Sequence, residues 1–250
     1  YEVKRGKDLM NAISGQKQEH ICLVTKKHVT ENKKYITGVA KKDERKIYET
    51  SKIPQEVIDT LGIFPLALNK EEVKLVKSIL DKDLEIGTFI SACRGLPRSW
   101  ASQSKGVLCV DRNDIERYYH LVSSCIKPPS KTVKKISLLK RPKIIAQRIM
   151  AYTKIPHCKI EVKADYDKDG LLTFETVENI YVGNKRNPYF YLGILNSSFV
   201  SFYLSRMVFT KYFETSMDFD EKYIHRLRFP RTTPDQQAPI ISLVDAIIQK

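Results

Sequence analysis

The stretch NPYFYLGILNSSFVSFYL, Asn187 to Leu204, decides the fold because most of its residues are apolar. The apolar run continues to about Met207, which is too long for a strand and typical of a largely buried helix. Pro188 suits the first turn of a helix, and the side chain of Asn187 suits the position that caps it. We therefore expect a buried helix from Pro188 to about Met207, in the core of the fold.

Three further segments carry helix signals. Pro54–Leu61 begins with proline at a favoured first-turn position, and a glycine follows its end. In Lys70–Lys82 an apolar stripe repeats at helical spacing, and Asn69 can cap its first turn. The last segment, Asp235–Gln249, has an amphipathic pattern of aliphatic residues. We expect all three segments to be helices.

Short strand-like runs separated by turns fill the middle of the chain, and they read LEIGTFISA, GVLCV, PKIIAQRI, KIEVKA, GLLTF and NIYV. DYDKDG, Asp165–Gly170, has the composition of a hairpin turn between two of them. An earlier strand is expected at His20–Lys27. The pattern predicts an α/β (mixed α+β) fold, with a small, twisted, largely antiparallel sheet, flanking helices and a C-terminal amphipathic helix.

Positive charge is the outstanding feature of the composition. The chain has 43 Lys and Arg against 29 Asp and Glu, a formal net charge of +14 and a pI of about 9.4. From Arg117 to Ile160 there are eleven Lys or Arg and no acid. Solvated surfaces usually mix charges of both signs, so this segment predicts a surface that tracks phosphates, with Tyr118, Tyr119 and Tyr152 available for stacking. A basic loop without a ligand is the alternative.

Cysteine usage and hydropathy indicate an intracellular protein. The five cysteines are odd in number and form no Cys-x-x-Cys pair, which argues against a disulfide framework and against a zinc site. No run of about 18 apolar residues is present, so we expect no membrane span. The chain starts YEVKRGKDLMNAIS, without a signal-peptide layout or an initiating Met. We expect a cytoplasmic location and a piece of a longer chain.

Two short motifs resemble parts of catalytic sites. Asn187-Pro188-Tyr189-Phe190 lacks the second proline of the (Asn/Asp)-Pro-Pro-aromatic loop with which amino-methylating DNA methyltransferases hold a flipped adenine. No Gly-x-Gly follows a strand to bind S-adenosylmethionine, so these residues are better explained as a helix start. Glu161 and Lys163 form half of a metal-dependent nuclease signature, but the nearest upstream acid is Glu116. We expect no catalytic residue and no metal ligand in this chain, with the Glu161/Lys163 nuclease as a remaining alternative.

The segment YFYLGILNSSFVSFYL, Tyr189–Leu204, resembles the "yLlaiLNSkl..fyl" helix of TaqI-like C-terminal specificity domains. These are the target-recognition domains of adenine-specific DNA methyltransferases and of type II restriction enzymes fused to a methyltransferase. Other blocks resemble the same family in the same order along the chain, and they are Gly6–Lys27, Leu84–Pro97, Val110–Tyr119, Arg141–Ile149 and Tyr223–Lys250. After Gly95 the family's Thr-Gly…Asn is replaced by Pro97-Arg98-Ser99-Trp100, so the usual contacts of that loop do not carry over.

The resemblance implies a division of labour within a prokaryotic restriction–modification system. Residues 1–50 would be the edge of a preceding methyltransferase domain and its linker, residues 51–234 the DNA target-recognition domain, and residues 235–250 a C-terminal helix. The methyltransferase domain would methylate adenine at N6 with S-adenosylmethionine, whereas this chain itself would hold no cofactor and would bind double-stranded DNA. A free-standing specificity subunit of a restriction system is the alternative.

Candidate DNA contacts follow from side-chain chemistry. Lysines supply point charges to phosphates without reading sequence, whereas arginines on short loops suit bidentate contacts to guanine. The expected phosphate contacts are Lys127, Lys131, Lys134, Lys135 and Lys140, with Lys185 and Arg186 ahead of the long helix. The expected guanine contacts are Arg94, Arg98, Arg141 and Arg148. Trp100 is expected to pack in the core or to stack on a base.

Overall fold

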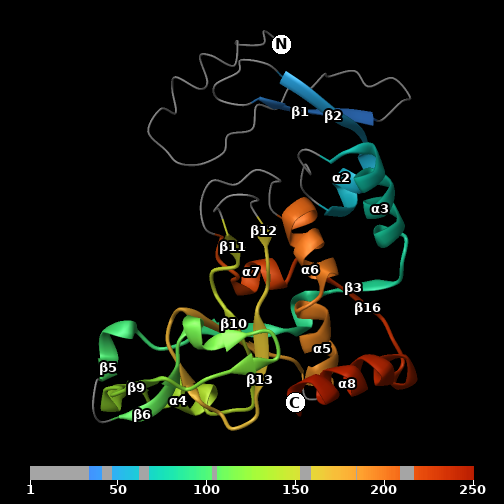
Figure 1. The fold of residues 1–250 in the computed structure, drawn as a ribbon. Helices are drawn as coiled ribbons and strands as arrows, with labels where there is room; N and C mark the ends of the chain where they lie inside the picture. The colour runs from blue at the N-terminus through green and yellow to red at the C-terminus, as the bar shows by residue number, and fades with distance from the viewer. Residues whose placement is uncertain are drawn as a thin grey trace.

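A computed structural model describes residues 34–40, 47–61, 68–102, 106–152, 159–183, 185–208 and 217–250. The strand expected at His20–Lys27 lies outside these residues, as does most of the segment 1–50. Figure 1 shows two groups of elements, a helical group on the right and a smaller group of short strands at the lower left. Within the described residues, no helix is both long enough and apolar enough to cross a membrane.

The apolar run that decides the fold forms two helices, so the prediction of one continuous helix is wrong. Helix α5 (Pro188–Leu195) is followed by α6 (Ser198–Tyr203) and a π-helical turn, η5 (Leu204–Val208). Asn196 separates them because its buried amide exchanges two hydrogen bonds with the backbone of Ala164. Ser197 then caps α6 by accepting a hydrogen bond from the Val200 N–H. The chain thus turns where a polar side chain holds it to a neighbouring strand.

The start of α5 and the three other expected helices are confirmed. Asn187 caps α5 by accepting from the Tyr189 N–H at 2.9 Å, and Pro188 occupies the first turn. Asn69 and Glu72 exchange side-chain and backbone hydrogen bonds at the start of one of the others. These three helices lie within two residues of the predicted ends, and they are α2 (Gln55–Leu61), α3 (Lys70–Leu80) and α8 (Pro234–Ile248).

The central sheet is antiparallel throughout, in the order β13-β10-β15-β4. Its strands are β4 (Ser91–Arg94), β10 (Lys143–Gln147), β13 (Ala164–Asp167) and β15 (Val177–Tyr181). Because side chains alternate between the faces of a strand, Ile144 and Ala146 join the main core with α5 and α6, whereas Ile145 packs against Val110 and Ile115 on the other face. Both faces are covered, which explains the almost continuous apolar run of β10.

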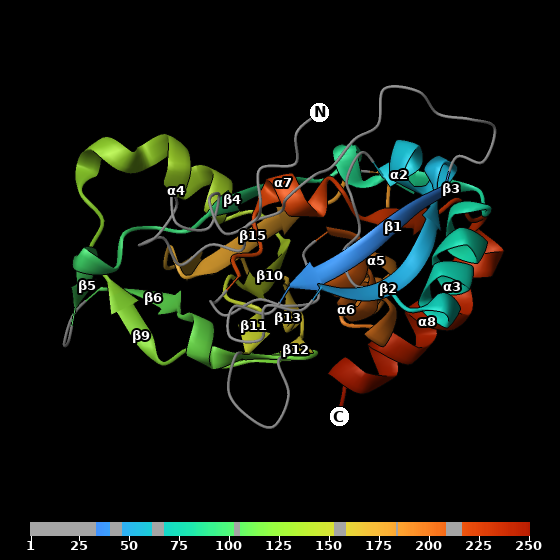
Figure 2. The same cartoon turned by 90° about the horizontal axis from the view of Figure 1, so that it is seen from above.

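A second sheet has the order β14-β6-β9-β5 and contains the parallel pair β14–β6. Its strands are β5 (Ala101–Ser102), β6 (Val107–Val110), β9 (Ser124–Ile126) and β14 (Leu172–Thr173). Helix α4 (Val133–Leu139) covers one face, where Leu139 and Ile136 pack with Cys109 and Ile126. Trp100 also packs against this cluster, in agreement with its expected place in the core. Figure 2 shows this lobe on the opposite side of the molecule from α3 and α8.

Two-stranded pairs and short turns complete the fold. The pairs are all antiparallel, and they are β1 (Lys34–Ala40) with β2 (Ile47–Pro54), β3 (Leu84–Ile86) with β16 (Arg228–Pro230), β7 (Ile115–Glu116) with β8 (Tyr119–His120), and β11 (Ala151–Tyr152) with β12 (Lys159–Ile160). The short helices are η1 (Gly87–Phe89), η2 (Arg98–Trp100), η3 (Arg112–Asp114), η4 (Ser130–Thr132) and α7 (Glu221–Ile224). The mixed α+β class is confirmed, but the strands form several small sheets instead of one.

The turn at Asp165–Gly170 forms, but it does not close a hairpin. Asp167 accepts hydrogen bonds from the N–H groups of Asp169, Gly170 and Leu171, at 2.8–3.0 Å. Gly170 has a φ of 69°, and a Cβ there would lie 2.0 Å from the carbonyl oxygen of Lys140. Strand β13 before the turn pairs with β10, whereas β14 after it pairs with β6. The turn therefore passes the chain from the central sheet to the second one.

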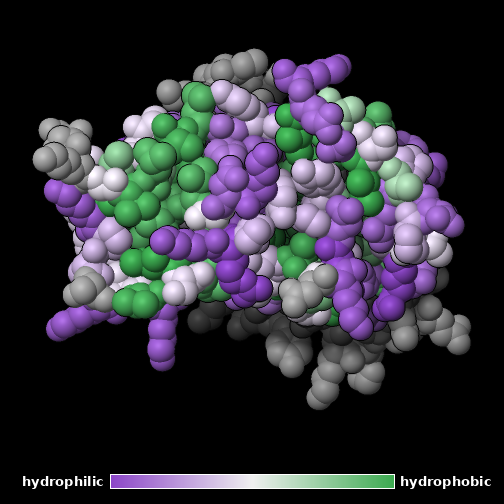
Figure 3. Space-filling view, turned by 90° about the horizontal axis from the view of Figure 1, so that it is seen from below, coloured by the Kyte–Doolittle hydropathy of each residue, from purple (hydrophilic) through white to green (hydrophobic). Residues whose placement is uncertain are grey.

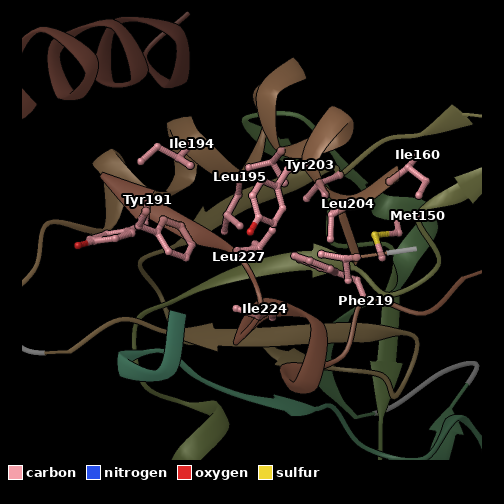
Figure 4. Packing of buried hydrophobic residues seen from close by; sticks show 14 of the residues in the cluster. Met150, Ile160, Tyr191, Ile194, Leu195, Tyr203, Leu204, Phe219, Ile224 and Leu227 are labelled. Carbon is pink, nitrogen blue, oxygen red and sulfur yellow. The ribbon is translucent and has the colours of Figure 1, made fainter. Parts of the chain in front are cut away.

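The main core lies around α5 and α6. Figure 4 shows side chains from several elements meeting there, among them Tyr203 and Leu204 from the second helix region and Phe219, Ile224 and Leu227 from the C-terminal part. Tyr203, Phe219 and Leu227 are each at most 1% exposed. This packing holds the chain after α7 against α6.

Candidate nucleic-acid interface

Helix α4 packs Ile136 and Leu139 against the second sheet and presents a row of basic side chains to solvent. Leu139 is fully buried and Ile136 half-buried, while the lysines between and around them are exposed. We call the exposed cations of this segment whose side chains have neither a carboxylate partner nor a hydrogen bond among the described residues the α4 surface, and they are Lys127, Lys131, Lys134, Lys140 and Arg141. The acid-free segment thus places five exposed cations on α4 and its flanks.

Lys135 lies on the same helix but has a structural contact. Its Nζ donates a hydrogen bond to the carbonyl oxygen of Gly95 at 2.8 Å. Gly95 is packed so closely that a Cβ would lie 2.2 Å from the carbonyl oxygen of Thr173. The contact fixes α4 relative to the loop that follows β4, and this loop carries Arg98. Lys135 therefore positions the surface, although the sequence pattern predicted a phosphate contact for it.

Lys143 fixes the C-terminal end of α4. It belongs to the basic run, but its own side chain is fully buried. Its Nζ donates to the carbonyl oxygens of Leu139 and Leu171 at 2.7 and 2.8 Å, and it forms an ion pair with Asp167 at 2.5 Å. Both side chains of this pair have 0% exposure. Burial is the main cause that lowers the pKa of Lys143, and the hydrogen bond with Asp167 opposes it. The count of eleven basic residues therefore overstates the charge that faces solvent.

Arg141 has an aromatic contact at the edge of the α4 surface. Its guanidinium carbon lies 5.7 Å from the centre of the Tyr181 ring, and the Tyr181 hydroxyl donates to the carbonyl oxygen of Leu138 at 3.0 Å. The turn at Gly170 lies against Lys140, which places the exposed Lys168 beside the same end of the helix. The sequence pattern did not single out Lys168, because only the fold brings its turn to α4.

The arginines expected to contact guanine differ in exposure and in their ion pairs. Arg98 is 57% exposed and pairs with the buried Asp111 at 2.7 Å, and Arg94 is 51% exposed and pairs with Asp220 at 3.3 Å. Arg148 is only 18% exposed, and it pairs with Asp218 at 2.5 Å and with Asp220 at 3.3 Å. Arg94 and Arg98 each keep free N–H donors, because one carboxylate does not use all five. Arg148 instead joins the C-terminal part of the chain to the central sheet.

The two basic residues expected ahead of α5 also differ. Arg186 holds Glu85 with two hydrogen bonds of 2.5 and 3.0 Å and donates a third to the Tyr191 hydroxyl at 2.6 Å. Its guanidinium carbon lies 3.7 Å from the centre of the Phe89 ring. Lys185 is exposed. Arg186 therefore stabilises the packing of α5 against β3 and η1, whereas the side chain of Lys185 lies in solvent.

A buried carboxyl group lies between the paired arginines of the central sheet. Glu178 on β15 is 2% exposed, and one of its oxygens has no hydrogen-bond partner. Burial, with the nearby charge of Asp220, raises the pKa of Glu178 to about 7, although Arg94 and Arg148 act in the opposite direction. Because the pKa of Glu178 in the folded state is above the ordinary value of 4.5, its protonated form favours the folded state. This contribution to stability is complete below pH 4.5 and is lost as the pH rises through about 7.

We expect Glu178→Gln to remove this loss. Between pH 5 and pH 8, the free energy of unfolding of the unmodified chain should fall by roughly 2 kcal/mol more than that of the variant. Denaturant unfolding at the two pH values measures the difference. The matched control is Glu175→Gln, which removes an exposed carboxylate from the same segment and should keep the pH dependence of the unmodified chain. Equal pH dependence in Glu178→Gln would contradict the assignment.

The residues of the nuclease alternative are engaged in ion pairs. Lys163 pairs with Glu116 at 2.7 Å, and Glu161 pairs with Arg117 at 3.4 Å. In the part of the chain that the structure describes, no group of three or more His, Cys, Asp or Glu side chains could hold a metal ion. The three cysteines described there, Cys93, Cys109 and Cys125, are free thiols.

Apolar side chains are gathered on a different face of the second sheet. Leu108 of β6 and Leu121, in the segment before β9, are 55% and 53% exposed, and Val122 is also exposed. Figure 3 shows apolar residues concentrated on the side of the molecule where this lobe lies. In register, Leu108 lies opposite Cys125, on the face that α4 does not cover. The lobe thus has a basic helical side and an apolar side.

Comparison with known proteins gave structural neighbours of low similarity. No protein-family model matches the sequence, and no curated protein matches it. The HsdS subunit from Thermoanaerobacter tengcongensis is similar with a TM-score of 0.43 and 13% identity, over 66% of this chain and 37% of that one. A second neighbour comes from a structural study of complex assembly and conformational transition of the type I R-M system. It has a TM-score of 0.42 and 14% identity, again over 66% of this chain and 37% of that one. The chain therefore spans 37% of the length of these neighbours, and neither match assigns it to a family.

Proposed function

We propose that this chain binds double-stranded DNA and selects its target sequence for a restriction–modification system. The α4 surface carries this proposal, because five exposed cations without carboxylate partners among the described residues project from one helix and its flanks. Such a surface releases counterions when it neutralises phosphates, and this release favours binding to a polyanion. Its lysines would hold the DNA backbone and fix the register of the protein on the duplex.

Sequence selection would come from arginines within and next to this surface. Arg98 lies on the loop that Lys135 ties to α4, and Arg141 follows the helix directly. Arg94 lies at the end of β4, just before the same loop. A guanidinium fork matches the two acceptors that guanine presents in the major groove, and each such pair discriminates against a wrong base by about 1–3 kcal/mol. The exposed ends of these arginines therefore suit the reading of bases better than the lysines do.

At a finer level, we propose that the chain serves an N6-adenine methyltransferase as its TaqI-like target-recognition part. The support is the sequence resemblance, which follows the family from block to block along the chain. The methyltransferase domain would bind S-adenosylmethionine, and it would precede this chain in one polypeptide. A free-standing specificity subunit would use the same α4 surface and would differ only in binding its methyltransferase as a separate protein. Both forms place the protein in a prokaryotic cytoplasm.

Selection from a pool of random-sequence duplexes tests the proposal. We expect the chain to enrich one defined sequence over successive rounds, and to prefer the selected duplex to its single strands. Arg98→Lys keeps the positive charge but removes the fork, so it should relax the preference at one base pair. Arg112→Lys is the matched control, because Arg112 lies outside the α4 surface and the loop after β4. A pool that stays random would refute target recognition.

A further inference from the structure

A small cavity beside α7 has a basic lining that the α4 surface does not include. It has a volume of about 180 Å³, and its polar side chains are His225, Arg226, Arg228 and Tyr203. Among the described residues that line it none is acidic, and the others are apolar, with Met207 among them. Pockets that enclose a whole small molecule typically measure about 300–1,000 Å³. The volume therefore suits a single ionic group.

Four elements bring these side chains together. His225 and Arg226 directly follow α7, and Arg228 begins β16, where it lies opposite Ile86 of β3. Tyr203 is the last residue of α6. Figure 4 shows the Tyr203 hydroxyl pointing toward Leu227, the residue between the two arginines. The buried side chains of Leu227 and Ile224 anchor this segment in the core, so the basic residues between and beside them are held in place.

Arg226 and Arg228 differ from most arginines of the described chain. Seven others form ion pairs with a carboxylate, and they are Arg94, Arg98, Arg117, Arg148, Arg186, Arg206 and Arg231. Arg226 and Arg228 have no carboxylate partner among the residues that the structure describes, although they line the same cavity. Arg228 is half-buried and donates to the carbonyl oxygen of Thr60 at 3.2 Å. A partly desolvated cation without a counter-charge, as Arg228 is, is unfavourable, and an anion beside it would remove that cost.

The other two polar groups are oriented as donors or can become donors. The Nε2 atom of His225 lies 2.7 Å from the carbonyl oxygen of Ile90, so it must carry a hydrogen, because a carbonyl only accepts. In the neutral ring Nδ1 therefore carries the lone pair, and it becomes a donor only when the imidazole is protonated. Tyr203 is 1% exposed, and burial raises the pKa of its hydroxyl. The hydroxyl accordingly keeps its proton at neutral pH and can donate it in a hydrogen bond.

We propose that this cavity binds a phosphate group through Arg226 and Arg228, with Tyr203 and His225 completing the site. Guanidinium groups bind phosphate oxygens with paired, charge-assisted hydrogen bonds, and no acid among the described lining residues competes for these donors. The phosphate belongs either to a nucleic-acid backbone or to a free phosphate, since both present the same oxygens. The site does not depend on duplex binding by the α4 surface.

Titration of the chain with inorganic phosphate at low ionic strength tests the site, with the arginine Nε–H signals followed by NMR. We expect a saturable shift of the Arg226 and Arg228 signals, and no comparable shift with chloride at equal ionic strength. Arg226→Gln changes an exposed side chain and should weaken phosphate binding about tenfold, the typical effect of removing a hydrogen bond to a charged group. Arg228→Lys, which keeps the charge, should also weaken binding because it removes the fork.

Arg112→Gln is the matched control, because it removes another arginine that has no carboxylate partner among the described residues and lies outside the cavity. Phosphate affinity should be unchanged in this variant. The source of the phosphate is read from duplex binding by Arg226→Gln. A salt dependence that is shallower by about 0.9 identifies a backbone phosphate, and an unchanged salt dependence identifies a free phosphate. Absence of a saturable shift, or equal affinity of Arg226→Gln and the unmodified chain, would overturn the proposal.

Discussion

Asp167→Ala is expected to lower the free energy of unfolding by about 3–5 kcal/mol, the usual cost of removing one partner of a buried ion pair. Asp167 and Lys143 are both fully buried, so the substitution leaves an ammonium group without its counter-charge. It also leaves the N–H groups of the turn that follows Asp167 without their acceptor. The loss is large against the stability of about 5–15 kcal/mol that is typical of a folded protein.

Denaturant unfolding measures this effect, and Asp169→Ala is the control. Asp169 lies in the same turn but is exposed, so its replacement should change stability by at most about 0.5 kcal/mol. The effect of Asp167→Ala should extend to binding, because Lys143 also holds the carbonyl end of α4 through Leu139. A loss of stability below about 1 kcal/mol would contradict the role assigned to this pair, whatever the effect on DNA binding.

Local signals in the sequence predicted the helices well. Asn69 with Glu72, and Asn187 with Pro188, start helices within the segments predicted for them, because capping depends on residues only a few positions apart. The alternation and length of the apolar runs also predicted the mixed α+β class. Signals of this kind act within one turn or one strand, so they are complete in a short window of sequence.

The errors came from contacts between residues far apart in the chain. The apolar run breaks at Asn196 because that side chain binds the backbone of Ala164, 32 residues earlier. Arg186 lies ahead of α5 as expected, but its partner is Glu85, 101 residues away. Lys143 belongs to a run that the sequence predicts to be solvated, and only the fold buries it against Asp167. A window of sequence around each residue contains none of these partners.

Removal of the α4 surface charges is expected to have the largest effect on function. Lys131, Lys134, Lys140 and Arg141 are exposed and lie within eleven positions of one another. Each phosphate contact contributes about 0.9 to the slope of log K against log salt concentration. If the three lysines contact phosphates and Arg141 contacts a base, replacement of the four by Gln makes this slope shallower by roughly 2.7 and weakens binding at 0.1 M salt on the order of several hundredfold.

A matched variant separates direct binding from net charge. Lys70, Lys74, Lys82 and Lys250 are exposed on α3, near its end and after α8, so their replacement by Gln removes the same charge elsewhere. Figure 2 shows α3 and α8 on the opposite side of the molecule from α4. Lys135 stays unchanged in both variants because its hydrogen bond to Gly95 positions the surface. Thermal unfolding of both variants checks that each keeps the fold.

The most direct test is therefore the salt dependence of duplex binding, measured by fluorescence anisotropy for the unmodified chain and for both variants. The proposed function predicts a slope that becomes shallower by about 0.9 for each phosphate that the α4 variant no longer neutralises, and a nearly unchanged slope in the α3 and α8 variant. Equal slopes for the two variants would show that the α4 surface does not contact DNA, and would contradict the proposed function.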